Sequence, residues 1–218
     1  MPRQARQTGE YLHIIVRGNG KQILFEDDAD RKKYLSLLQK YSAETGIIIL
    51  AYCLMDNHVH LLIRDAAGAA SVFMKKTGVS YVLYYNTKYE RTGHLFQDRY
   101  KSEVIDSDAY LLAVYRYILN NPAKAGICAA EKYLWSSYRE YGKTEGLTDT
   151  GMLREMIGDK ATLSGFLGSR MMKFTWILIL RKSATAGQLL SCVPRLALPM
   201  ARNFSNLPEM TVTRLWLR

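Results

Sequence analysis

Two histidines one residue apart, His58 and His60, lie in the apolar run of residues 54–63 and are the side chains best suited to chemistry. Side chains alternate between the faces of a strand, so both imidazoles would project from one face, roughly 7 Å apart at ~3.3 Å per residue. Neutral imidazoles at this spacing can bind one divalent metal ion. Taken alone, the pattern is more typical of the polar face of an amphipathic strand, so the rest of the chain must decide.

The segments around this run predict a ferredoxin-like α+β fold. Apolar and β-branched runs indicate strands at residues 11–16, 47–55, 58–63 and 94–105, and a tight turn at Asp56-Asn57 makes a hairpin of the middle two. Helical patterns lie between them, at residues 28–45 and at 66–89, the second with an interruption expected near Gly78. This order predicts a split βαββαβ antiparallel sheet with its helices on one face. The first and third strands would be neighbours, which brings His13 towards His58 and His60.

A further helix, from residue 109 to about 120, is stopped by Pro122 and carries two tyrosines. At 100° per residue, Tyr115 falls in the core stripe of Leu111, Val114 and Ile118. Tyr117 points about 160° away and shares a face with Asn121, its i+4 neighbour. We therefore expect Tyr117 to be free to face a site and Tyr115 to pack in the core.

Polar side chains in two segments could contact nucleic acid. Gln97, Arg99 and Lys101 would share one face of the strand at 94–105 and form a phosphate or base contact surface. Lys75 and Lys76 lie among tyrosines in the helical region 66–89, where aromatic rings can stack on unpaired bases. The alternative is that both segments are ordinary solvated faces.

Charge and cysteine content set bounds on the protein's class. The net charge of +10 resides mostly in the tail, because residues 1–159 carry +2 and residues 160–218 carry +8. A total of this kind indicates attraction to polyanions but no particular site. Three scattered cysteines without a CxxC pair favour a reducing compartment, and the longest apolar run, residues 174–180, is too short to cross a bilayer. We expect a soluble, cytoplasmic protein without membrane association.

Taken together, these motifs resemble the single-tyrosine HUH transposases of small insertion sequences, most closely the REP-associated tyrosine transposase branch. The resemblance runs from about Tyr11 to Tyr141. It rests on His58-Val59-His60, on Gly93-His94-Leu95-Phe96-Gln97, and on Tyr117 followed by Asn120-Asn121-Pro122, with further matches at residues 16–19, 99–102 and 135–141. A His-x-His strand followed some 60 residues later by a helix with this tyrosine and Asn-Pro is a specific combination, and it favours the metal site over the polar strand face.

The resemblance implies a metal-dependent nuclease and strand transferase, a transposase acting on single-stranded or hairpin DNA through a 5′-phosphotyrosine intermediate. Carried over residue by residue, His58 and His60 are metal ligands, Asn121 completes the metal site, and Tyr117 is the nucleophile. The cofactor would be Mg²⁺ or Mn²⁺. DNA contacts are expected from Gln97, Arg99, Lys101, Arg17, Lys75 and Lys76. The protein would act as a monomer or a homodimer.

The sequence leaves one alternative function open and disfavours another. A non-catalytic protein that binds DNA or RNA hairpins, a domesticated regulator on the same fold, would bind without cleaving. A metal-free two-histidine phosphoesterase would need a second His-x-Ser/Thr strand, whereas the other histidines, His13 and His94, are isolated.

The domain boundary is expected after residue 145. Residues 1–145 would form the HUH domain and residues 146–218 an extension without assigned function. All fifteen tyrosines lie at or before Tyr141, and Glu209 is the only acid after Asp159. This shift predicts an appended segment or a frame-shifted end, with disorder as an open alternative from about residue 171.

Overall fold

A computed structural model describes residues 8–168 of the chain. The chain divides into two units, Met1–Arg170 and Met171–Arg218, and all elements described below belong to the first. The expectations for residues 171–218 lie outside the described residues. Within residues 8–168, no helix combines the length and apolar character needed to cross a bilayer.

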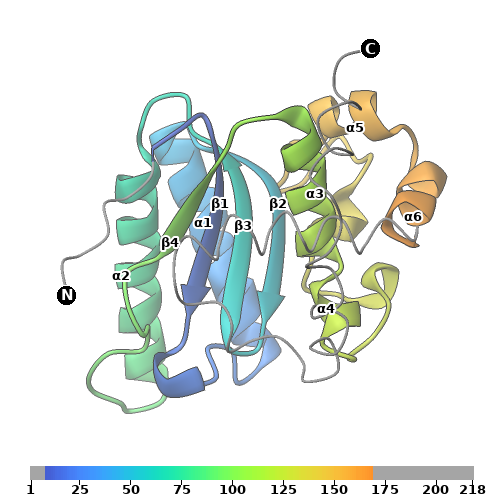
Figure 1. The fold of residues 1–218 in the computed structure, drawn as a ribbon. Helices are drawn as coiled ribbons and strands as arrows, with labels where there is room; N and C mark the ends of the chain where they lie inside the picture. Colours follow the sequence, from blue (N-terminus) through green and yellow to red (C-terminus); the bar gives the residue numbers. More distant parts are fainter. Residues whose placement is uncertain (1–7, 169–218) are drawn as a thin grey trace, which may run out of the picture. The chain divides into compact units, whose positions relative to one another are not determined.

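The first six major elements follow the predicted βαββαβ order (Figure 1). They are β1 (Tyr11–Arg17), α1 (Asp28–Thr45), β2 (Ile48–Met55), β3 (His58–Arg64), α2 (Ala70–Lys88) and β4 (Lys101–Ile105). The strands form one antiparallel sheet in the order β2-β3-β1-β4, which confirms the ferredoxin-like prediction and the pairing of the first and third strands.

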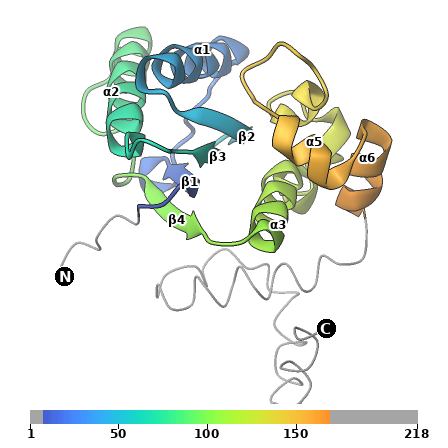
Figure 2. The same cartoon turned by 90° about the horizontal axis from the view of Figure 1, so that it is seen from above.

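The two faces of the sheet are covered by different helices. Alternate residues of β1 and β3, among them Leu12, Ile14, Val59 and Leu61, pack into a core that also contains buried residues of α1 and α2. Figure 2 shows α1 and α2 on this side, as predicted, and α3 (Asp108–Leu119) on the opposite side. Helix α3 contacts β2 and β3, so it faces the side chains that alternate with the core residues.

Helix α2 is continuous, and the predicted interruption near Gly78 is wrong. A mid-helix glycine costs about 1 kcal/mol relative to alanine. The buried face of α2 nevertheless extends on both sides of it, through Phe73 and Thr77 before and Tyr81 and Tyr85 after. Packing along this whole face outweighs the propensity of one residue.

The strand expected at residues 94–105 is also shorter than predicted. Only Lys101–Ile105 forms β4, while Phe96 makes a single bridge to Gly18. Lys101 pairs with Ile15, so the segment from Phe96 to Lys101 has two residues more than the segment of β1 that it faces. The surplus residues have no backbone partner on β1, so they bend away from the sheet instead of continuing the strand. Gln97 and Arg99 therefore do not share a strand face with Lys101.

Helix α3 begins at the Ser107 cap and ends at Leu119, as predicted, and Pro122 lies in the short α4 (Asn121–Lys124). The chain then covers the outer edge of β2: the Leu54 backbone N–H donates to the Trp135 carbonyl at 2.8 Å. The Tyr52 N–H donates to Ser137 Oγ at 3.0 Å. These bonds satisfy backbone groups that an open edge would expose. Residues 8–168 also contain three short 3₁₀ turns: η1 (Asn19–Lys21), η2 (Ala130–Lys132) and η3 (Ser137–Glu140).

Two more helices, α5 (Gly151–Ile157) and α6 (Lys160–Gly168), follow the boundary expected at residue 145 and belong to the same unit as the sheet. Arg116 Nη2 and Asn120 Nδ2, both from the α3 region, donate to the carbonyl of Leu167 in α6 at 3.2 and 3.1 Å. The compact unit therefore extends past residue 145. The functional boundary there stays a prediction.

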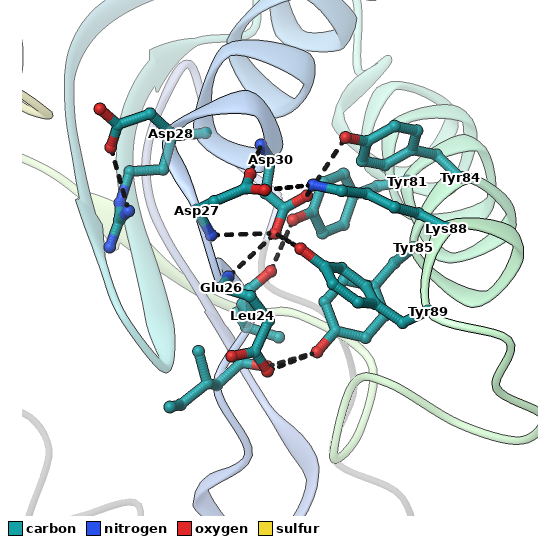
Figure 3. A network of polar contacts seen from close by, with 12 residues as sticks. Leu24, Glu26, Asp27, Asp28, Asp30, Tyr81, Tyr84, Tyr85, Lys88 and Tyr89 are labelled. Carbon is teal, nitrogen blue, oxygen red and sulfur yellow. Dashed lines mark hydrogen bonds and ion pairs between the residues drawn. The ribbon is translucent and has the colours of Figure 1, made fainter.

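A buried carboxylate joins the start of α1 to the end of α2 (Figure 3). Asp30 is 0% exposed and accepts hydrogen bonds from the backbone N–H of Glu26 at 2.9 Å, from the Tyr89 hydroxyl at 2.7 Å and from Lys88 Nζ at 2.7 Å. Burial alone would raise the pKa of this carboxyl, but the bonds from Lys88 and Tyr89 outweigh it and lower the pKa. Asp30 is thus ionised and fully bonded in the core.

Replacing Asp30 by asparagine should destabilise the fold strongly. The amide keeps the size of the side chain but removes the buried charge that accepts bonds from Glu26, Tyr89 and Lys88, and hydrogen bonds to a charged group contribute about 1.5–3 kcal/mol each. Lys88 keeps its second carboxylate partner, Asp27, at 2.6 Å, so the loss comes mainly from the buried side of the network. Urea unfolding of Asp30→Asn measures the change in the free energy of unfolding. The matched control is Asp28→Asn, an exposed acid of the same helix that pairs with Arg31 at 3.6 Å and should cost less than about 1 kcal/mol. Equal effects of the two substitutions would contradict the role of the network.

Candidate active site

His58 and His60 project from β3 on the face that α3 covers. In the β1–β3 register His60 lies opposite Ile15 and His58 opposite Arg17, and paired residues share a face. The two imidazole centroids are 5.0 Å apart with the ring planes at 88°. The sheet therefore brings both histidines to one point, as the sequence predicts.

His13 joins this pair from the neighbouring strand. Its Nε2 lies 3.0 Å from Nδ1 of His60, and the two rings stack with centroids 5.3 Å apart. Both side chains are only 2% exposed. The sequence predicts that the first and third strands are neighbours, which places His13 near this site. It does not predict the direct contact between His13 and His60.

Both histidines of β3 are held in the neutral form. Burial lowers the pKa of His58 to about 4, with a smaller contribution from the charge of Arg17, and burial lowers the pKa of His60 well below its ordinary value. Nδ1 of His58 lies 2.7 Å from Oδ1 of Asn57. Because an amide oxygen only accepts, the proton of His58 resides on Nδ1, which leaves a lone pair on Nε2. A neutral imidazole with a bare nitrogen is the form that binds metal.

Tyr117 faces the histidines and Tyr115 does not, which agrees with the helix phase predicted from the sequence. The Tyr117 ring meets those of His60 and His13 edge-on, with centroids 5.4 and 5.8 Å apart. The Tyr115 ring is fully buried against Tyr141, and its hydroxyl has no hydrogen-bond partner among the described residues. Burial also raises the pKa of Tyr115, which makes this phenol a poor nucleophile.

Asn121 lies one helical turn after Tyr117 and is buried. Its Nδ2 donates to the backbone carbonyls of Tyr117 at 2.9 Å and Ile118 at 3.3 Å. These bonds hold the amide against the end of α3 and use its nitrogen rather than its oxygen, so the oxygen is the atom that a metal ion would take.

Lys124 is a site residue that the sequence analysis missed. Its Nζ lies 3.9 Å from the centroid of the Tyr117 ring. Burial, with a smaller contribution from the nearby charge of Arg116, lowers the pKa of this ammonium to about 7. Lys124 follows Tyr117 by seven residues, or two helical turns, but Pro122 lies between them, so helical periodicity could not be extended across the gap.

The donor set suits a divalent ion of intermediate hardness. Within residues 8–168, no cluster of three or more His, Cys, Asp or Glu side chains could hold a metal ion. A metal here would therefore rely on the two imidazoles, the Asn121 amide oxygen and oxygen atoms from water or substrate. Nitrogen and neutral oxygen ligands of this kind fit Mn²⁺ and, less well, Mg²⁺.

The predicted DNA-contact residues separate into three groups. Arg17 lies opposite His58, and Lys101 pairs with Ile15, so both are on the face of the histidines. Exposed Gln97 and Arg99 lie in the bulge before Lys101.

Lys75 and Lys76 belong to α2, which covers the opposite face of the sheet (Figure 2). Lys76 also pairs with Glu44 at 2.9 Å. The structure does not bring these two lysines together with the histidines.

Comparisons with known proteins agree with this geometry. The model of the family described as "Transposase IS200 like" matches residues 7–121. Among solved structures, a REP-associated tyrosine transposase bound to a REP hairpin has a TM-score of 0.56 and 14% identity, covering 69% of this chain and 91% of its own. A candidate transposase of Deinococcus radiodurans has a TM-score of 0.38 and 18% identity, covering 55% and 97%. No protein with a curated description matches the chain.

The solved neighbour shares the sheet and helices at low sequence identity, which supports the fold assignment. The family match covers more than half of the chain, including β1, the strand with His58 and His60 and the helix with Tyr117. The chain therefore belongs to the IS200-like transposase family.

Proposed function

We propose that this transposase is a divalent-metal-dependent nuclease and strand transferase that cleaves single-stranded DNA at or near a hairpin. The observation that supports the proposal is the position of Tyr117, whose ring lies against His60 and His13, while Asn121, one helical turn later, donates to its backbone carbonyl. In this proposal Tyr117 is the nucleophile, and His58, His60 and Asn121 hold the metal ion.

In the proposed reaction, Oη of Tyr117 attacks the scissile phosphorus and the 3′-oxygen of the preceding nucleotide leaves. The products are a 5′-phosphotyrosine bond and a free 3′-hydroxyl, and attack by another 3′-hydroxyl reverses the step without ATP. A bound divalent ion would polarise the phosphate and stabilise the charge that develops on it. The phenol must lose its proton, and the protonated form of Lys124, which coexists with the neutral amine near pH 7, would favour the phenolate through its charge.

The DNA would approach from the side of β1 and β4. Arg17 and Lys101 share the face of the histidines and can neutralise phosphates on either side of the scissile bond. The neighbour of known structure is bound to a REP hairpin, and we propose a hairpin-bearing strand for this chain too. Because backbone contacts carry no sequence information, base recognition would fall to exposed residues such as Gln97 in the bulge.

Substitution of the nucleophile tests the proposal directly. With a labelled hairpin-bearing strand from the DNA flanking its gene and Mn²⁺, the wild type should form a covalent adduct visible on a denaturing gel. Tyr117→Phe should form none at any Mn²⁺ concentration, because the attacking oxygen is gone.

Tyr115→Phe is the matched control and should keep full adduct formation, because the hydroxyl it removes makes no hydrogen bond within residues 8–168. Tight binding without any wild-type adduct would instead favour the non-catalytic hairpin-binding regulator. Loss of the adduct in Tyr115→Phe alone would refute the assignment of the nucleophile.

The DNA path can be tested by salt dependence. Lys101→Ala should weaken hairpin binding and reduce the slope of log K against log salt by about 1, because one phosphate contact is lost. Lys75→Ala removes an equally exposed lysine from the opposite side of the sheet and should leave the slope unchanged. Fluorescence anisotropy at several salt concentrations measures both, and the reverse result would place the DNA on α2.

The low pKa values of the ligands predict acid-tolerant metal binding. Ordinary histidines, with a pKa near 6.5, would lose about 100-fold in affinity as a pair on going from pH 7.5 to 5.5. Since burial lowers the pKa of His58 to about 4 and that of His60 well below 6.5, both stay neutral over this range. The Mn²⁺ affinity, measured from the free-ion electron paramagnetic resonance signal, should change less than about threefold. His58→Ala should abolish this binding at both pH values.

A further inference from the structure

One ring nitrogen of His60, Nδ1, contacts another histidine, His13. The buried contact between its Nδ1 and Nε2 of His13 is 3.0 Å long, a hydrogen-bond distance. When both imidazoles are neutral, such a bond contains one proton, so one ring donates and the other accepts. Which ring donates decides whether His60 can act as a ligand.

The two arrangements have opposite consequences. If His60 donates from Nδ1, its Nε2 has a lone pair that a metal ion can take. If His13 donates instead, the proton of a neutral His60 must reside on Nε2, and the same atom is blocked. The contact alone therefore does not make a metal site; a third group must select the arrangement.

Glu103 is in position to make this selection. In the β1–β4 register it lies directly opposite His13, and its Oε2 is 3.8 Å from Nδ1 of His13. This nitrogen is buried and has no hydrogen-bond partner among the described residues. At 3.8 Å the carboxylate acts through its charge, which favours the proton on Nδ1 of His13 and leaves Nε2 as the acceptor.

Helix α3 brings Tyr110 close to Glu103. Burial raises the pKa of Tyr110, and the nearby Glu103 carboxylate raises it further. The carboxylate is only partly exposed, so its charge acts on His13 with less screening by water than at an open surface.

We infer that Glu103 and His13 are positioning residues that fix the proton of His60 on Nδ1 and so present its Nε2 to the metal ion. This inference rests on the proposed function. Outer partners of this kind fix the tautomer and orientation of a ligating histidine, and their loss costs about 10–100-fold in metal affinity.

Nitrogen NMR of the metal-free full chain reads the tautomer of His60 directly. In the wild type the proton should reside on Nδ1, and in Glu103→Gln the spectrum should shift towards the Nε2 tautomer. A wild-type His60 with its proton on Nε2, or an unchanged tautomer in Glu103→Gln, would overturn the inference. This readout does not depend on cleavage, so it separates failure of the inference from failure of the proposed function.

Mn²⁺ titration by calorimetry supplies the second readout. Glu103→Gln and His13→Phe should each lose about 10–100-fold in affinity. His13→Gln should restore part of it, because its Oε1 can accept from Nδ1 of His60 without help from a carboxylate. The matched control is Glu10→Gln, an exposed acid before β1 that pairs with Arg64 at 2.8 Å and should bind Mn²⁺ like the wild type.

The variants also distinguish a structural role from the inferred one. His13→Phe can lose Mn²⁺ affinity because it misfolds. Its melting temperature is therefore compared with that of His13→Gln, and the affinity of the variant that stays folded tests the inference. Wild-type affinity in both Glu103→Gln and His13→Gln would overturn the inference. If the wild type neither binds Mn²⁺ nor forms the covalent adduct, the proposed function fails, and the tautomer measurement still decides the His60–His13 arrangement.

Discussion

The pairing of β1 with β3 is the constraint on which the site depends. Their register places His13, Ile15 and Arg17 on the same face as His60 and His58, while Leu12 and Ile14 enter the core on the other face. A slip of one residue would reverse every side chain of a strand and exchange its histidine face for its apolar face. The apolar core under α1 and α2 therefore excludes every register shifted by an odd number of residues, because such a shift would bury imidazoles there and expose aliphatic residues.

Much of this arrangement could be predicted from the sequence, and the reasons are local. The strand period places His58 and His60 together, and the helix period separates Tyr117 from Tyr115. Both are geometric properties of a single element, so no tertiary information is needed. The topology also followed, because the order of elements leaves few ways to close one antiparallel sheet.

The errors arise where two elements must be compared. Residues 97–100 lie inside the strand predicted at 94–105, but the facing segment from Ile15 to Gly18 is two residues shorter than residues 96–101, and only the pairing reveals this surplus. Lys75 and Lys76 have a suitable composition for nucleic acid, but they lie on a helix behind the sheet. The contacts of Lys124 with Tyr117 and of His13 with His60 join residues through packing, which periodicity does not encode.

Burial gives the site its electrostatic character. His60, His13 and Asn121 are almost completely enclosed, and the same enclosure that keeps the imidazoles neutral also lowers the pKa of Lys124. A site made of neutral donors attracts a divalent ion less strongly than one made of carboxylates. With the proposed ion bound, such a site would leave room for a phosphate oxygen as a further ligand.

The carbonyl of Leu167 has a consequence for how the gene can evolve. Arg116 and Asn120 both donate to this one atom, and Arg116 is 3% exposed on the helix that carries Tyr117. A premature stop before codon 167 would remove this acceptor from the helix that carries Tyr117, together with part of the cover over Arg116. Selection on the reading frame is therefore expected to reach at least to this codon, well past the last residue of the family match.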